Sequence, residues 1–170
     1  SAFQFMDLPD KVLEVLEFIP NNFYELWAQQ VLVLNQAKGS SSGATTIKYQ
    51  PLDYQCIKSI SPLSVHLIIV GFSRMGGALA IETVRIADFA NRKKTRITII
   101  DKDAATEKNY FKRRYPYYEL IDEIEINFIT GGVETEEIRL NLLEWANEKD
   151  VLPTIAICLN NPNKGLTTAL

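Results

Sequence analysis

The pattern of apolar and polar positions changes period several times in the second half of the chain. Short apolar runs have the length of strands, and the segments between them carry apolar residues at helical spacing. The expected strands are residues 65–70, 96–101, 123–129 and 154–159, and the expected helices are residues 75–90, with Asn91 as a left-handed cap, 104–114 and 134–148. Strands that alternate with helices are typical of a parallel sheet. We therefore expect an α/β fold, a Rossmann-like parallel sheet, over residues 63–170.

The burial expected for each strand predicts the strand order. Segments 65–70 and 154–159 are almost entirely apolar, as strands covered on both faces are, whereas 123–129 alternates apolar residues with polar ones and is expected at an edge. With right-handed crossovers the order becomes third, second, first, fourth, or 3-2-1-4. A ligand is expected where this order reverses, above Gly71 and Asn160. The second half of a six-stranded fold is absent, so we expect a fragment of a longer protein.

The first 62 residues follow a different pattern. Residues 8–37 have helical spacing with a break at 20–22, so residues 1–38 are expected to form a helical arm or hairpin that docks on a partner. Residues 39–62 are expected to be a linker with a short strand at 45–49 and a short helix at 52–60. The linker begins where the sequence KGSSSGA offers no core-forming side chain.

A glycine-rich loop follows the strand at 65–70. Gly71, Ser73 and Gly76 have the spacing of the dinucleotide fingerprint Gly-x-Gly-x-x-Gly, with a serine at the middle glycine. In that fingerprint the first glycine allows a tight turn, the second lets the backbone approach a pyrophosphate, and the third lets the helix pack closely on the strand. Ser73 adds a Cβ near the diphosphate and a hydroxyl that can donate to it. Arg74 is either a phosphate contact or a solvated side chain.

Asp101 ends the second strand, near the offset at which a carboxylate accepts from ribose hydroxyls. This position favours a ribose without a 2′-phosphate, although Lys102 beside it leaves room for one. We therefore expect NAD-like or adenine nucleotides ahead of NADP. The alternative is that Asp101 only caps a turn, in a Rossmann shell that binds no nucleotide.

Composition and motifs argue against several other functions. A 46% hydrophobic chain with a net charge of -3 is typical of a soluble globular domain, and no nucleic-acid partner is expected. The segment KNYFKRRYPYY at 108–118 interleaves basic and aromatic residues, but aromatic residues at this spacing more often pack a helix end. Residues 71–75 begin like a nucleophile elbow, which Met75 interrupts. His66 precedes Ser73 on the strand itself, so no catalytic base is available and no enzyme is expected.

Histidine and cysteine usage completes this picture. His66 is expected to be a partly buried histidine with one hydrogen-bond partner. Cys56 and Cys158 are the only cysteines, and with a single histidine they cannot form a usual zinc site, so no metal is expected. Cys158 lies in an apolar run and is expected to be a small buried hydrophobe in a reducing, cytoplasmic setting. No apolar run approaches the roughly 20 residues of a membrane helix.

Three segments resemble one family. VHLIIVGFSRMGGALA at 65–80, RITIIDKD at 96–103 and TIAICLNN at 154–161 are similar to the TrkA-N, or RCK, domains that regulate potassium channels and transporters. The resemblance covers about residues 63–170. Asp-Phe-Ala-Asn at 88–91 and Arg-Tyr-Pro at 114–116 also resemble TrkA-N modules of bacterial multidomain proteins.

The resemblance implies a site for NAD, NADH or an adenine nucleotide, and no catalysis. Together with the residues around the glycine loop, the candidate cofactor-binding set is Gly71, Phe72, Ser73, Arg74, Met75, Gly76, Asp101, Lys102, Gly131 and Asn160. It also implies a cytoplasmic, ligand-driven switch that forms a homo-oligomer. Such a switch acts on a channel or transporter portion of the same or a partner chain, at the periphery of the inner membrane.

The chain departs from the family in two places. Ser73 replaces a glycine, and the sequence Thr130-Gly131-Gly132-Val133 stands where the family shows Gly-Asp, so an acidic contact is missing. Either the ligand differs or this copy is an assembly scaffold. Two alternatives therefore remain beside the regulatory domain: a fragment of an NAD-dependent oxidoreductase whose substrate domain lies beyond residue 170, and a Rossmann scaffold that only oligomerises.

Overall fold

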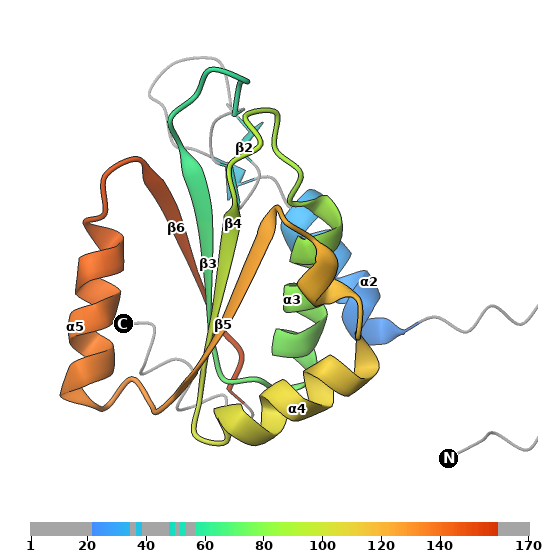
Figure 1. The fold of residues 1–170 in the computed structure, drawn as a ribbon, viewed down its shortest axis with the longest axis vertical. Helices are drawn as coiled ribbons and strands as arrows, with labels where there is room; N and C mark the ends of the chain where they lie inside the picture. The colour runs from blue at the N-terminus through green and yellow to red at the C-terminus, as the bar shows by residue number, and fades with distance from the viewer. Residues whose placement is uncertain (1–21, 35–36, 39–47, 50–51, 54–56, 160–170) are drawn as a thin grey trace, which may run out of the picture.

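A four-stranded parallel sheet forms the centre of the molecule (Figure 1). The computed structural model describes residues 22–34, 37–38, 48–49, 52–53 and 57–159 of the chain. The strands of the sheet are β3 (Ser64–Val70), β4 (Thr95–Asp101), β5 (Ile124–Thr130) and β6 (Val151–Ile157). They are hydrogen-bonded in the order β5-β4-β3-β6. The predicted Rossmann-like α/β fold and its 3-2-1-4 strand order are therefore confirmed, with β5 at an edge as expected.

Helices cover the two faces of the sheet unequally. Helices α2 (Phe23–Gln29), α3 (Arg74–Ile86) and α4 (Ala104–Arg114) lie on one face, and α5 (Glu136–Ala146) lies on the other, as Figure 1 shows. This division follows from the right-handed crossovers: moving from β3 through β4 to β5 places α3 and α4 on one side, and returning to β6 places α5 on the opposite side. A short 3-10 helix, η2 (Tyr118–Leu120), follows α4.

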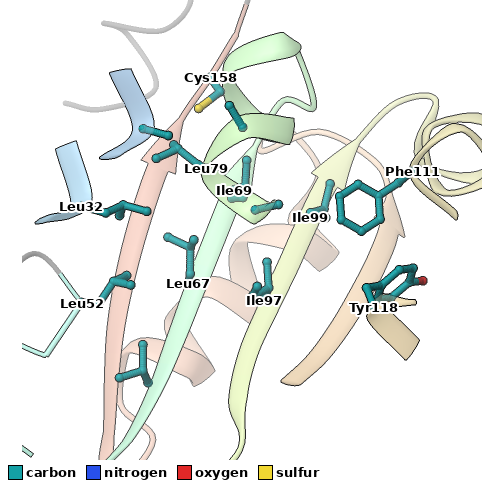
Figure 2. Packing of buried hydrophobic residues seen from close by; sticks show 14 of the residues in the cluster. Leu32, Leu52, Leu67, Ile69, Leu79, Ile97, Ile99, Phe111, Tyr118 and Cys158 are labelled. Atoms are coloured by element: carbon teal, nitrogen blue, oxygen red, sulfur yellow. The ribbon is translucent and has the colours of Figure 1, made fainter. Parts of the chain in front are cut away.

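The core lies mainly between the sheet and the three-helix face. Alternate residues of β3 and β4, among them Leu67, Ile69 and Ile99, point toward Leu79 of α3 and Phe111 of α4 (Figure 2). Each of these five side chains is at most 3% exposed. A smaller apolar cluster lies on the α5 face, where the buried side chains are Ile68, Val70, Ile100 and Ile138.

Part of the predicted N-terminal arm packs on the domain. Asn22 caps α2, which starts just after the predicted break, and the π-helix η1 (Gln30–Leu34) continues it. Ala28 and Leu32 are 0% and 3% exposed and belong to the main core beside α3. Arg85 of α3 pairs with Glu25 of α2 at 3.3 Å and with Glu82 at 3.0 Å. Over residues 23–34 the arm is therefore part of the packed structure; residues 1–21 lie outside the described part.

Several predicted boundaries were wrong. The helix predicted over 8–37 does not reach residue 37, because β1 (Ala37–Lys38) pairs antiparallel with β2 (Lys48–Tyr49). The described residues of the segment 52–60 form turns and no helix, and Leu52 and Ile57 are instead buried in the core. Nine residues that end at a Ser-Pro pair are too short to hold a helix without strong packing along one face.

Helix α3 also ends earlier than predicted. Its last residue is Ile86, and Ala87 rather than Asn91 follows as the C-cap. The left-handed residue of the following turn is Arg92, with φ of 53°. The side-chain amide of Asn91 donates instead to the backbone carbonyls of Ser61 and Leu63, at 3.0 and 2.6 Å. Asn91 thus ties this turn to the segment that leads into β3.

Strand β6 begins at Val151 and ends at Ile157, earlier at both ends than predicted, and it contains Pro153. The N–H of Cys158 donates to Val70 and that of Ser64 to Asp150, at 2.8 and 2.9 Å. Because backbone groups alternate sides along a strand, Pro153 turns away from β3, where a missing N–H breaks no hydrogen bond of this pair.

The prediction that this strand is covered on both faces is also wrong. Residue Ile155 of β6 is 50% exposed, and six of the seven residues of the strand are only half-buried. The reason is its position: β6 is the outer strand of the described sheet on the side opposite β5.

Among the described residues, no helix has both the length and the apolar character needed to cross a bilayer.

Candidate functional site

The turn between β3 and α3 requires a glycine at its first position. Gly71 has φ of +87°, a conformation that L-residues with a side chain rarely adopt. A Cβ at this position would lie 2.9 Å from Cδ2 of Leu159 and 3.0 Å from the carbonyl oxygen of Cys158. The role expected for the first glycine of the loop, a tight turn, is therefore confirmed.

Gly76 has the role expected of the third fingerprint glycine, which is to let α3 pack closely on β3. A Cβ there would lie 2.6 Å from the carbonyl oxygen of Gly71 and 3.1 Å from Cγ2 of Ile69. At Gly77 the nearest atom, Cζ of Phe72, would be 3.8 Å away, an ordinary contact. The close helix-strand packing expected at Gly76 is confirmed, and Gly77 has no such constraint.

Ser73 is the N-cap of α3. Its backbone is extended, with φ of -69° and ψ of -179°, so this position does not require the conformational freedom of glycine. The Ser73 hydroxyl oxygen accepts a hydrogen bond from the backbone N–H of Met75 at 3.3 Å. The serine that replaces the middle glycine therefore holds the first turn of the helix.

Asp101 binds the backbone of two loops. One carboxylate oxygen, Oδ2, accepts from the N–H of Phe72 at 2.7 Å, and Oδ1 accepts from the N–H of Asp103 at 2.9 Å. Asp101 thus fastens the glycine loop to the end of β4 and orders the turn into α4. Each oxygen keeps capacity for a second hydrogen bond, since a carboxylate offers about four acceptor positions.

A cavity of about 1,080 Å³ lies over the carboxyl ends of the four strands, and we call it the strand-end cavity. Its wall includes four of the predicted site residues, Gly71, Asp101, Lys102 and Gly131. Apolar side chains of the strand ends and of α5 line much of the rest. The sequence predicted that these four positions would meet, because the carboxyl ends of parallel strands share one edge of a sheet.

Two basic side chains of the strand-end cavity differ in their partners. Lys102 pairs with Glu134 at 2.8 Å, and this hydrogen bond raises the pKa of the Lys102 ammonium group. Arg139 of α5 also lines the cavity and has no ion pair with a described residue. Arg139 was not among the predicted site residues, because nothing in the sequence pattern around 136–146 distinguishes it from a solvated charge.

A second cavity of about 600 Å³, the helix-side cavity, lies between α2, α3 and α4. Phe72, Ser73 and Arg74 line it, so the structure divides the predicted site residues between two cavities on the two sides of the glycine loop. Met75 lines neither cavity and packs at the margin of the core. Asn160 lies outside the described residues.

Two other chemistry-bearing residues are buried. Nε2 of His66 lies 2.8 Å from Oγ1 of Thr98, which confirms the expected single hydrogen-bond partner, and the ring meets that of Trp145 edge to face. The expectation that His66 is only partly buried was wrong, because β3 is a central strand and the residue is 1% exposed. Burial first, and then the charge of Arg96, lower the pKa of His66 to about 4. Burial raises the pKa of the Cys158 thiol to about 11, as suits a buried apolar residue. No cluster of His, Cys, Asp or Glu suited to a metal occurs in the described part of the chain.

The chain matches no protein-family model, and neither a curated protein nor a solved structure shows significant similarity to it. What the fold and the two cavities define is a class: a Rossmann-like α/β domain whose glycine loop separates a cavity over the strand ends from a cavity among the helices.

Proposed function

We propose that the chain is a ligand-sensing regulatory domain that binds NAD(H) or an adenine nucleotide in the strand-end cavity. The observation that carries this proposal is the position of the cavity. It lies where the strand order reverses between β3 and β6, with the tight turn at Gly71 and the carboxylate of Asp101 on its wall. Open α/β sheets bind ligands at this place.

The chemistry of the cavity wall suits the parts of such a ligand. Val70, Ile100 and Ile157 offer apolar contacts to an adenine ring. Arg139, which forms no ion pair with a described residue, supplies positive charge for phosphate groups, and a guanidinium can form two parallel hydrogen bonds to a phosphate. A volume of about 1,080 Å³ is sufficient for a nucleotide.

Asp101 has two roles in this proposal. It holds the glycine loop through the N–H of Phe72, and its remaining acceptor positions receive the ribose hydroxyls. The neighbouring ion pair of Lys102 with Glu134 adds a carboxylate to the cavity wall, which disfavours a 2′-phosphate. A nucleotide with an unphosphorylated adenosine ribose is therefore the expected ligand.

The wider role rests on the resemblance to TrkA-N domains at 65–80 and 96–103. In this role the chain works in the cytoplasm as part of a homo-oligomer and passes the state of its ligand to a potassium channel or transporter. Ligand binding shifts a conformational equilibrium only through different affinities for the two states, so a moving element must touch the ligand. The β3–α3 turn is suited to this, because its first residue, Gly71, lines the strand-end cavity.

A thermal-shift titration tests the proposed ligand. NAD+, NADH, AMP, ADP and ATP are added separately to the chain, and a ligand at 100 times its dissociation constant adds about 2.7 kcal/mol to the stability. The Arg139→Gln variant should lose most of this shift. Arg113→Gln removes the same charge from a residue that lines neither cavity, and it should keep the shift. No shift with any nucleotide would favour a scaffold that only oligomerises.

A further inference from the structure

Two arginine side chains that form no ion pair with a described residue line the helix-side cavity. Arg74, the first residue of α3, and Arg114, the last residue of α4, both line it. Neither forms an ion pair with a described residue, whereas Arg85 and Arg96 do. Two guanidinium groups on one cavity wall, neither paired within the described part of the chain, favour the binding of an anion.

Aromatic rings complete the wall of this cavity. Tyr110 and Tyr115 of the α4 region line it together with Phe72 and Phe111. Phe111 is buried, but Tyr110 is 60% exposed and is available to a ligand. The guanidinium carbon of Arg114 lies 5.5 Å from the centre of the Tyr115 ring, which holds this arginine beside the aromatic surface.

The carboxylates of the cavity have different partners. Glu25 forms an ion pair with Arg85. The Glu107 carboxylate has no hydrogen bond or ion pair with a described residue, and burial followed by the charges of Asp101 and Asp103 raises its pKa. The Glu107 carboxylate is therefore available to accept a hydrogen bond, and it takes up a proton at a higher pH than an ordinary glutamate does.

We propose that the helix-side cavity binds a small aromatic phosphate ester, with the phosphate held by Arg74 and Arg114 and the ring in contact with Tyr110. The Ser73 hydroxyl, at the N-terminus of α3, donates a further hydrogen bond to the phosphate. The size of the cavity, about 600 Å³, fits a small molecule of this kind. This site is separate from the strand-end cavity and does not depend on nucleotide binding there.

Phenyl phosphate is the probe for this site, and titration calorimetry of the chain measures its binding. Inorganic phosphate, which lacks the ring, should bind more weakly. Arg114→Gln should weaken the binding of phenyl phosphate by about tenfold or more, because it removes a charge-assisted contact. Tyr110→Ala should weaken phenyl phosphate and leave inorganic phosphate unchanged.

Matched controls separate this site from general attraction and from the nucleotide site. Arg113→Gln, at the neighbouring residue of α4, should change the affinity by less than about twofold. Arg139→Gln, in the strand-end cavity, should also leave phenyl phosphate unaffected. The proposal is overturned if the native chain shows no saturable binding, if Arg113→Gln weakens binding as much as Arg114→Gln, or if only Arg139→Gln abolishes it.

Discussion

The carboxylate of Asp101 and the backbone of Phe72 are joined by a hydrogen bond of 2.7 Å across the start of the glycine loop. Through this bond the end of β4 holds the turn between β3 and α3. The two residues also face different cavities: Asp101 lines the strand-end cavity, and Phe72 lines the helix-side cavity. This one hydrogen bond therefore joins the walls of the two cavities.

Asp101→Asn should destabilise the fold. The variant replaces the charged acceptor of two backbone N–H groups by a weaker one, so we expect a loss of about 1–2 kcal/mol in the free energy of unfolding. Urea denaturation measures this change. Asp103→Asn is the matched control, since the Asp103 side chain makes no cap hydrogen bond to α4 and should contribute less than about 0.5 kcal/mol. Equal effects of the two variants would contradict the role given to Asp101.

Gly76→Ala and Gly77→Ala should have opposite effects although the residues are neighbours on α3. At Gly76 the added Cβ would lie 2.6 Å from a backbone oxygen, so the helix must move and the stability should fall by about 1–3 kcal/mol. At Gly77 the Cβ has room, and the better helix propensity of alanine should add up to about 1 kcal/mol. Thermal denaturation of the two variants decides this. A stable Gly76→Ala protein would show that the packing of α3 on β3 is looser than described.

Acidification should weaken the fold through His66. The pKa of His66 is about 6.5 in the unfolded chain and about 4 in the folded one. As the pH falls, the imidazole is therefore protonated in the unfolded state before it is protonated in the folded state, and this favours unfolding. The contribution is complete above pH 6.5 and is lost as the pH falls toward 4, for a total of about 3 kcal/mol. Urea denaturation of the native chain and of His66→Gln between pH 7 and pH 4 isolates this contribution. The prediction fails if both proteins lose the same stability.

Leu32→Ala should show that the helical arm belongs to the core. Leu32 is 3% exposed and contacts the main cluster, so its truncation should cost about 2–4 kcal/mol. Val33→Ala, at the next residue, removes a side chain that is 36% exposed and should cost less than about 1 kcal/mol. Chemical denaturation compares the two. An arm that packs elsewhere would make the two costs similar and small.

The sequence predicted the repetitive part of the fold because its periods are unambiguous. Helix α4 begins and ends where the pattern placed it, and the apolar run before Gly71 is the central strand β3. Strand β6 was predicted beside β3 but over residues 154–159, whereas it runs from Val151 to Ile157. It includes Pro153, which at the outer side of the strand costs no hydrogen bond with β3. Burial at an edge depends on neighbours in space, which a local pattern does not contain.

The site was predicted where backbone geometry alone defines it. Gly71, Gly76 and Asp101 could be found, since the turn, the close packing and the strand end each require a particular residue type. The sequence could not predict that Ser73 and Arg74 line a different cavity from Gly71 and Asp101. The direction of a side chain depends on how α3 leaves the sheet. The same holds for Arg139, which α5 brings to the cavity from the opposite face.

The central claim is that the strand-end cavity binds a nucleotide. Titration calorimetry of the native chain with NAD+, NADH, AMP, ADP and ATP tests it most directly, with circular dichroism to show that the protein is folded. The account predicts saturable binding of at least one of these nucleotides at one site per chain, lost on Arg139→Gln and kept on Arg114→Gln. A folded chain that binds none of them, or whose binding is unchanged by Arg139→Gln, would contradict it.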